Sequence, residues 1–115
     1  MNGPIVYVDD EPTLCRLFDL HFGGAQLPAR SFSDPEAALA FLDETPVSAV
    51  LCDYRMPAMT GLEFLARMPQ DVPFYLITGD HSFREEADAN PRVTQVVEKP
   101  FEYDALIAEL RALLD

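Results

Sequence analysis

Short apolar runs alternate with helical patterns along the whole chain, and this alternation is the strongest constraint on its fold. Five runs have the length and composition of β-strands, and a predicted helix follows each of them. Strand–helix repetition of this kind implies a parallel sheet with helices on both faces and right-handed crossovers. The sequence therefore predicts a doubly wound five-stranded α/β domain. The predicted strands cover residues 5–8, 29–32, 47–53, 74–77 and 95–98.

Proline, glycine and capping residues place the ends of the predicted helices. Pro12 is tolerated in the first turn of a helix, and Gly23-Gly24 are predicted to end that helix. Asp34 before Pro35 has the pattern of an N-cap followed by a first-turn proline. Helical spacing predicts that the buried face of the first helix consists of Leu14, Leu17, Phe18 and Phe22.

Composition limits the class of protein. A chain of 115 residues with 49% apolar residues predicts one domain, over residues 1–115, with a substantial core. There is no apolar stretch long enough to cross a bilayer and no room for a signal peptide before the first strand, so we expect an intact N-terminus and a cytoplasmic protein. Cys15 and Cys52 form no CxxC pair and are expected to be reduced core thiols. A net charge of −12 argues against direct binding to nucleic acid and favours cationic ligands.

Acidic and polar side chains follow four of the predicted strands. Asp9 and Asp10 follow the first strand, Asp53 ends the third, Thr78 follows the fourth and Lys99 follows the fifth. Because parallel strands end at the same edge of a sheet, these side chains should meet in one crevice, where open α/β sheets bind their ligands. Each residue alone could be a helix cap, a turn residue or a surface side chain. Their shared place at one edge favours a functional site.

Three carboxylates in one crevice repel one another, so a cation is needed to offset them. Mg²⁺ fits best, because it is hard, prefers oxygen ligands and usually keeps waters while using one or two carboxylates. His21 and His81 stand apart from each other in the sequence, so no softer metal site is predicted. We therefore expect Mg²⁺ to be held by Asp9 and Asp10 beside Asp53, directly or through water.

A metal, a carboxylate, a hydroxyl and an ammonium group together suit phosphoryl transfer. A carboxylate such as Asp53 can act as a nucleophile toward phosphorus and form an aspartyl-phosphate. The transfer depends on charge neutralisation and in-line positioning more than on covalent help from the protein. Lys99 and Mg²⁺ would neutralise the phosphoryl oxygens, and Thr78 could hydrogen-bond one of them.

At these residues the chain resembles a response-regulator receiver domain of the chemotaxis type, from about Ile5 to Leu114. Each motif is short, but the ordered set is specific. The resemblance implies a flavodoxin-like fold with strand order 2-1-3-4-5, flanked by five helices. The matching motifs are Val8-Asp9-Asp10-Glu11-Pro12, Asp53-Tyr54-Arg55-Met56-Pro57-Ala58-Met59-Thr60-Gly61, Thr78-Gly79 and Lys99-Pro100-Phe101.

The resemblance implies roles for the acidic positions. Asp53 corresponds to the phosphoacceptor, which takes its phosphoryl group from a histidine kinase or a histidine phosphotransfer protein. Asp10 corresponds to the main metal-binding acid, and Asp9 to its neighbour. Asp53 itself and the backbone carbonyl of Arg55 complete the implied protein ligands of Mg²⁺.

The resemblance also assigns the remaining polar positions. Thr78 corresponds to the switch hydroxyl that moves toward the phosphoryl group. Lys99 corresponds to the lysine that pairs with the phosphate. Pro100 is expected to follow a cis peptide bond, which is accessible to proline.

Three positions depart from the family pattern. Val96 stands where many receivers carry Tyr or Phe, so no ring can swing inward, and we expect weaker coupling between phosphorylation and the last strand. The predicted helix within residues 80–91 has few apolar residues, so we expect it to be short or mobile. Arg55 could pair with Asp80 or Glu11, lie over the phosphoryl group and modulate the aspartyl-phosphate lifetime, or face solvent.

The leading hypothesis for function is a single-domain signalling receiver in a two-component phosphorelay. It would signal through partner binding or onward phosphate transfer to an unknown downstream protein, with no catalysis beyond its own phosphorylation and dephosphorylation. An alternative is a receiver cut from a larger response regulator or hybrid histidine kinase.

Other classes of function fit the residues less well. Mg²⁺-dependent phosphatases with an aspartate nucleophile usually carry an Asp-x-Asp pair on the first strand, whereas Asp53 is followed by Tyr54-Arg55. A nucleotide or flavin module would carry a glycine-rich loop where Asp9-Asp10-Glu11 stand, and these acids would repel a phosphate. The intact set of acids, threonine and lysine argues against an unphosphorylated pseudo-receiver.

Overall fold

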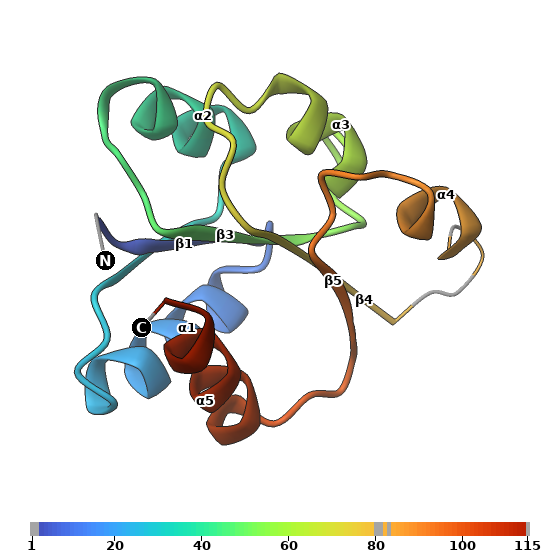
Figure 1. The fold of residues 1–115 in the computed structure, drawn as a ribbon. Coiled ribbons are helices and arrows are strands. Elements are labelled where there is room, and N and C mark those ends of the chain that lie inside the picture. Colours follow the sequence, from blue (N-terminus) through green and yellow to red (C-terminus); the bar gives the residue numbers. More distant parts are fainter. Residues whose placement is uncertain (1–2, 80–81, 83, 115) are drawn as a thin grey trace.

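The computed structural model describes residues 3–79, 82 and 84–114. Within this part of the chain, strands and helices alternate as the sequence predicts (Figure 1). In chain order the elements are β1 (Ile5–Val8), α1 (Pro12–Gly24), β2 (Ala29–Phe32), α2 (Pro35–Glu44), β3 (Ala49–Asp53), α3 (Gly61–Arg67), β4 (Phe74–Thr78), α4 (Arg84–Asp88), β5 (Gln95–Glu98) and α5 (Tyr103–Leu114).

The strands of the described residues form one parallel sheet in the order β2-β1-β3-β4-β5. Helices α1 and α5 cover one face of this sheet, and α2, α3 and α4 lie on the other (Figure 1). The doubly wound, flavodoxin-like fold with strand order 2-1-3-4-5 is therefore confirmed. Such a sheet brings the carboxyl ends of its strands to one edge.

The central strands β1, β3 and β4 are buried along their whole length, because helices cover both faces of the sheet. Their side chains alternate between two apolar clusters. Val50 and Cys52 enter the cluster that contains Phe64 of α3. Leu51 enters the cluster that contains Phe18 of α1. The end of β3 is therefore held between two packed layers.

The structure confirms several predicted element ends and shifts others. Asp34 accepts a hydrogen bond from the backbone N–H of Glu36 and caps α2, as predicted. Strand β3 begins at Ala49 and not near Val47, because the N–H of Val47 donates to the Gln70 side chain (3.1 Å) and is not available to the sheet.

Helix α1 ends at Gly24, as predicted. The residue with a positive φ at the end of the helix is, however, neither Gly23 nor Gly24. The N–H of Ala25 donates to the His21 carbonyl, and the N–H of Gln26 donates to the Gly23 carbonyl, both at 3.1 Å. Gln26 takes the positive φ, at 57°. The helical hydrogen bonds thus continue one residue past the glycines, to Ala25, and the bond from Gln26 closes the helix end.

The buried face of α1 differs in part from the prediction. Phe18 and Phe22 are fully buried, but Cys15 completes the buried set, and Leu17 is 39% exposed. Leu17 instead lies beside a surface cavity of about 380 Å³. The rotation of α1 about its axis is set by the aromatic stack of Phe18 on Tyr7, whose ring centroids are 4.5 Å apart.

Helix α4 is short, as its poor apolar pattern predicts, with five residues. Ala87 is fully buried and docks the helix on the cluster beneath α2 and α3. Arg84 pairs with Asp88 of the same helix and with Glu98 of β5 (2.9 Å). These ion pairs are exposed and contribute little to stability. Mobility of α4 stays a prediction.

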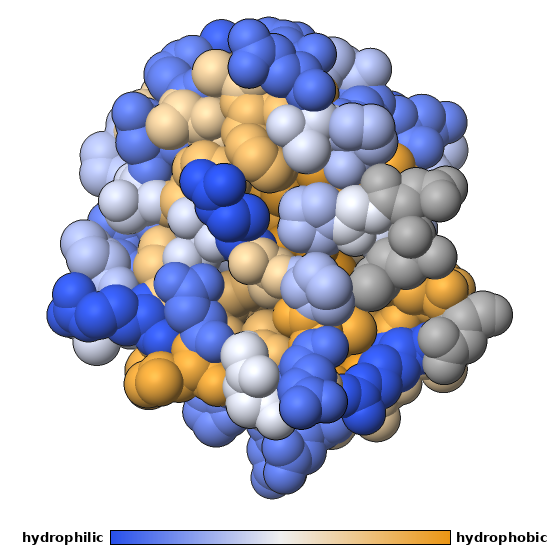
Figure 2. Space-filling model, turned by 90° about the vertical axis from the view of Figure 1, so that its left-hand side faces the viewer, coloured by the Kyte–Doolittle hydropathy of each residue, from blue (hydrophilic) through white to orange (hydrophobic). Residues whose placement is uncertain are grey.

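The described helices include none that is both long and apolar enough to cross a membrane. Viewed from the side opposite α4, the surface is mostly hydrophilic, with apolar residues in small groups between the polar ones (Figure 2).

Gly61 begins α3 at a point where the chain passes close to the end of β3. A Cβ at this position would lie 2.8 Å from the carbonyl oxygen of Asp53 and 2.5 Å from Leu76 Cδ1. The Gly61 N–H also donates to the Tyr54 carbonyl (2.8 Å), which closes the loop after β3. Leu76 can move its side chain, but the contact with the Asp53 carbonyl is with backbone, so a side chain here has to displace the end of β3.

We expect Gly61→Ala to lower the free energy of unfolding by about 1–3 kcal/mol, as other overpacking substitutions do. Urea denaturation monitored by circular dichroism measures this change. Gly23→Ala is the matched control, because nothing lies within 4 Å of its added Cβ. That control should be neutral or raise stability by up to about 1 kcal/mol. A Gly61→Ala variant as stable as the wild type would contradict the close approach.

Candidate functional site

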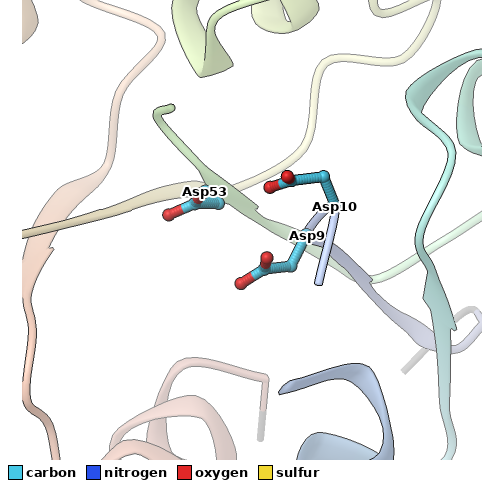
Figure 3. Close-up of side chains that lie close together, drawn as sticks. All are labelled: Asp9, Asp10 and Asp53. Carbon is cyan, nitrogen blue, oxygen red and sulfur yellow. The ribbon is translucent and has the colours of Figure 1, made fainter. Parts of the chain in front are cut away.

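Three carboxylates meet at the carboxyl edge of the sheet (Figure 3). Asp53 is the last residue of β3, and Asp9 and Asp10 follow the neighbouring strand β1, where Val8 lies in register with Cys52. The three side chains point to the same side, and their nearest oxygens lie within 4.8 Å of one another. Asp9 is fully buried, whereas Asp10 is partly exposed. The predicted crevice is thus present.

Lys99 brings a positive charge into this crevice from β5. Its N–H donates to the Thr78 carbonyl (2.8 Å), which extends the pairing of β4 and β5 by one residue. Its ammonium Nζ lies 2.9 Å from Asp53 Oδ1 and 3.8 Å from Asp9 Oδ2. The peptide bond between Lys99 and Pro100 is cis, as expected.

Burial and charge act in opposite directions on the central pair. Burial raises the pKa of Asp53, and the Lys99 ammonium lowers it. The negative charges of Asp9 and Asp10 raise it further, so the pKa of Asp53 lies above its usual value. Burial disfavours the charge of Lys99, but the hydrogen bond and charge of Asp53 raise the pKa of Lys99 above its usual value. Negative charge in the crevice is therefore only partly balanced.

Asp9 is held by three neighbours that the sequence did not indicate, two of them at its carboxylate and one at its backbone carbonyl. The Tyr7 hydroxyl donates to Asp9 Oδ2 (2.8 Å), and the Glu11 N–H donates to Asp9 Oδ1 (3.0 Å). The Cys15 thiol donates to the Asp9 backbone carbonyl (3.3 Å). The sequence does carry a signal for Tyr7, because residues two apart on a strand, such as Tyr7 and Asp9, point to the same face of the sheet.

Both cysteines are buried free thiols, as predicted. Burial and the charge of Asp9 raise the pKa of Cys15. Burial also raises the pKa of Cys52 well above its usual value. Both residues are therefore protonated core side chains at neutral pH.

The other predicted site residues lie around the carboxylates. Thr78 is buried at the end of β4, in register with Glu98 of β5. Arg55 is exposed in the loop after β3, and its guanidinium carbon lies 6.0 Å from the Tyr54 ring centroid. The predicted pairing of Arg55 with Asp80 lies outside the described residues, as does His81.

The oxygen donors of the crevice fit a small, hard cation. Mg²⁺ ligands lie about 2.0–2.1 Å from the ion, so ligands on opposite sides are about 4 Å apart. The nearest oxygens of Asp9, Asp10 and Asp53 lie within 4.8 Å of one another, which suits an ion bound partly by carboxylates and partly by waters. Oxygen-only ligation is also the chemistry that Mg²⁺ prefers.

The sequence profile described as response regulator receiver domain matches residues 5–111. The chain belongs to this family. Receivers of this kind are the signalling domains of two-component response regulators, so the resemblance found from the motifs is confirmed.

Two relatives show how the receiver is placed in longer proteins. The transcriptional regulatory protein FixJ of Bradyrhizobium diazoefficiens is 31% identical over 118 residues, which cover 98% of this chain and 57% of FixJ. The cyclic di-GMP phosphodiesterase response regulator RpfG of Xanthomonas campestris is 44% identical over 69 residues, which cover 54% of this chain and 18% of RpfG. The receiver thus spans little more than half of FixJ and a smaller share of RpfG.

Solved structures match the whole receiver. The chemotaxis response regulator CheY4 of Vibrio cholerae superposes with a TM-score of 0.82, at 23% identity, over 99% of this chain and 100% of that chain. A CheY-like receiver domain protein from Methanospirillum hungatei superposes with a TM-score of 0.87, at 18% identity, over 100% of this chain and 95% of that chain. At these identities the likeness supports the fold.

The metal-free receiver should become more stable when Asp53 is neutralised. Folding raises the pKa of Asp53. Below the pKa that Asp53 has in the unfolded chain, the group therefore adds to the free energy of unfolding. This contribution is lost as the pH rises through the pKa that Asp53 has in the folded protein. At pH 7 the charged carboxylate therefore lowers stability. Asp53→Asn, which keeps an oxygen that can accept from Lys99, should raise the free energy of unfolding, and the gain should shrink as the pH is lowered.

Urea denaturation at several pH values, with and without Mg²⁺, measures this effect. Mg²⁺ at 100 times its dissociation constant should stabilise the wild type by about 2.7 kcal/mol and stabilise Asp53→Asn less. Asp71→Asn is the control, because Asp71 is exposed and precedes β4, at the opposite edge of the sheet. Equal stability of wild type and Asp53→Asn without metal at every pH would contradict the electrostatic origin of the raised pKa.

Proposed function

We propose that this receiver accepts a phosphoryl group on Asp53 from a phosphohistidine of a histidine kinase or a histidine phosphotransfer protein. An Asp53 carboxylate oxygen attacks phosphorus, a new P–O bond forms, and the P–N bond to the donor histidine breaks with its electron pair leaving on nitrogen. The observation that carries the proposal is the 2.9 Å contact between Asp53 Oδ1 and Lys99 Nζ, beside two further carboxylates. A nucleophile, a fixed cation and a metal-ligand set thus share one crevice.

Asp9, Asp10, Asp53 and the backbone carbonyl of Arg55 would hold Mg²⁺ in this site. The ion, when bound, supplies positive charge that offsets the carboxylates and the phosphoryl oxygens. Asp10 is the partly exposed member of the set, which suits a direct ligand at the mouth of the crevice. Asp9 is fully buried and already has a hydrogen bond on each oxygen, which suits a role through water.

Lys99 and Thr78 would recognise the phosphoryl group after transfer. Lys99 already lies at the nucleophile, so its ammonium can pair with a phosphoryl oxygen without a large movement. Thr78 ends the strand next to β3, and its carbonyl accepts from the Lys99 N–H, so the two residues are linked through the backbone. A displacement of the Thr78 backbone would therefore also displace the Lys99 backbone.

The link from the site to the last strand is weaker here than in receivers with an aromatic residue at this position. Val96 is half-buried and packs against the cluster that contains Leu76, without a ring that could rotate inward. Weaker coupling to β5 stays a prediction. Partner contacts at α4 and its neighbouring loops would then carry more of the output.

The receiver would act in the cytoplasm, where thiols such as Cys15 and Cys52 stay reduced. Its output would pass to a protein partner, to another histidine, or to further domains of a longer regulator such as those of its relatives. Its catalysis would be limited to its own phosphorylation and dephosphorylation, and an exposed Arg55 beside the nucleophile would set the lifetime of the aspartyl-phosphate.

Labelling by radioactive acetyl phosphate tests this function without a known kinase. The wild type should incorporate label only when Mg²⁺ is present, and a chelator should prevent it. Asp53→Ala should abolish incorporation, whereas Asp71→Ala, at the opposite edge of the sheet, should leave it unchanged. Label that survives Asp53→Ala, or that forms equally without Mg²⁺, would overturn the assignment.

A further inference from the structure

Tyr7 places a hydroxyl group on a buried strand whose other residues are apolar. Its neighbours in β1 are aliphatic, and the side chain is 1% exposed. The ring stacks on Phe18, which in turn stacks on Phe22, with centroids 4.5 Å and 4.1 Å apart. The ring is therefore fixed by packing that a phenylalanine could supply equally well. The hydroxyl needs a separate explanation.

The hydroxyl has one acceptor, which belongs to the proposed phosphorylation site. It donates to Asp9 Oδ2 at 2.8 Å, while Asp9 Oδ1 accepts from the Glu11 N–H at 3.0 Å. Burial, followed by the charge and hydrogen bond of Asp9, raises the pKa of Tyr7 far above its usual range, so the group remains a donor. Asp9 is thus oriented by one donor on each of its carboxylate oxygens.

The same hydrogen bond affects which carboxylate Lys99 contacts. The Lys99 ammonium lies 2.9 Å from Asp53 Oδ1 but 3.8 Å from Asp9 Oδ2, the oxygen that the Tyr7 hydroxyl occupies. A fully buried carboxylate that lost its hydroxyl donor would need another one, because an unsatisfied buried charge is costly. Lys99 is the nearest cation in the described part of the crevice, and a move toward Asp9 would take it away from Asp53.

We propose that Tyr7 is a positioning residue of the phosphorylation site. Its hydroxyl orients the Asp9 carboxylate within the carboxylate set and, by donating to Oδ2, offsets part of the charge that would otherwise draw Lys99 away from Asp53. This inference rests on the proposed function. The groups that orient metal-binding side chains commonly change metal affinity by about 10- to 100-fold when they are removed.

The test compares Tyr7→Phe with Tyr75→Phe. The first variant removes the hydroxyl and keeps the ring in the stack. The second removes a hydroxyl from a buried tyrosine of β4, two strands away in the sheet but in the same apolar cluster as Tyr7. Calorimetric titration of the unphosphorylated proteins gives the Mg²⁺ dissociation constant, and acetyl phosphate gives the labelling rate at saturating Mg²⁺. Urea denaturation of each variant reports on packing.

Tyr7→Phe should weaken Mg²⁺ binding about tenfold and slow labelling at saturating Mg²⁺, whereas Tyr75→Phe should change neither. The change that Mg²⁺ causes in the near-ultraviolet tyrosine spectrum should also be smaller in Tyr7→Phe than in the wild type and in Tyr75→Phe, where Tyr54 beside Asp53 contributes equally. This spectral response is not expected of a tyrosine that only packs. It also tests the wild type directly if Tyr7→Phe is too unstable to titrate.

The possible results distinguish a failure of the proposed function from a failure of the role of Tyr7. A wild type that neither binds Mg²⁺ nor becomes labelled overturns the proposed function and this inference with it. A labelled wild type with unchanged Mg²⁺ affinity in Tyr7→Phe, or with equal losses in both variants, overturns the role of Tyr7 alone. A wild-type tyrosine spectrum that Mg²⁺ does not alter overturns it as well.

Discussion

The ion pair between Asp53 and Lys99 is the interaction on which the rest of the site depends. A carboxylate in a dry environment is unfavourable unless it is paired and hydrogen-bonded. Asp53 is nearly buried, and the Lys99 ammonium at 2.9 Å is what makes its charge tolerable there. Among the side chains described in the crevice, one ammonium faces three carboxylates, so the remaining negative charge favours a divalent cation.

The backbone of the sheet, and not side-chain adaptation, brings these charges together. The Tyr54 N–H donates to the Ile77 carbonyl, and the Lys99 N–H donates to the Thr78 carbonyl, so sheet hydrogen bonding continues to the strand ends where the candidate site lies. The close approach of Gly61 to the Asp53 carbonyl fixes the loop that follows. The backbones of Asp53 and Lys99 therefore keep their relative positions for as long as β3, β4 and β5 stay paired.

The sequence predicts this crevice because its main signals are local. A charged residue directly after an apolar run, as at Asp53 and Lys99, identifies a strand end, and the parallel topology then brings the ends together. The rotation of α1 was not predictable in this way, because burial of Leu17 or Cys15 depends on how Phe18 meets Tyr7 across the layer. The contact between Tyr7 and Asp9 has a local signal, since the two residues share a strand face, but the sequence does not show that the hydroxyl reaches the carboxylate.

Tyr7 shows why the supporting groups of a site are harder to find than its reactive groups. In the sequence it is one more residue of an apolar strand, whereas in the structure its hydroxyl is the donor to Asp9 Oδ2. The left-handed residue Gln26 was missed for a different reason, since two glycines nearby carried the expected signal. In both cases the deciding factor was hydrogen bonding, which composition does not encode.

The measurement that tests the central claim most directly is the position of the phosphoryl group among the three carboxylates. The receiver would be phosphorylated with acetyl phosphate and Mg²⁺, reduced with borohydride to convert the acyl phosphate into an alcohol, and digested for mass spectrometry. The pairing with Lys99 predicts that the reduced residue is Asp53 alone. Reduction at Asp9 or Asp10 would contradict the assignment of the nucleophile.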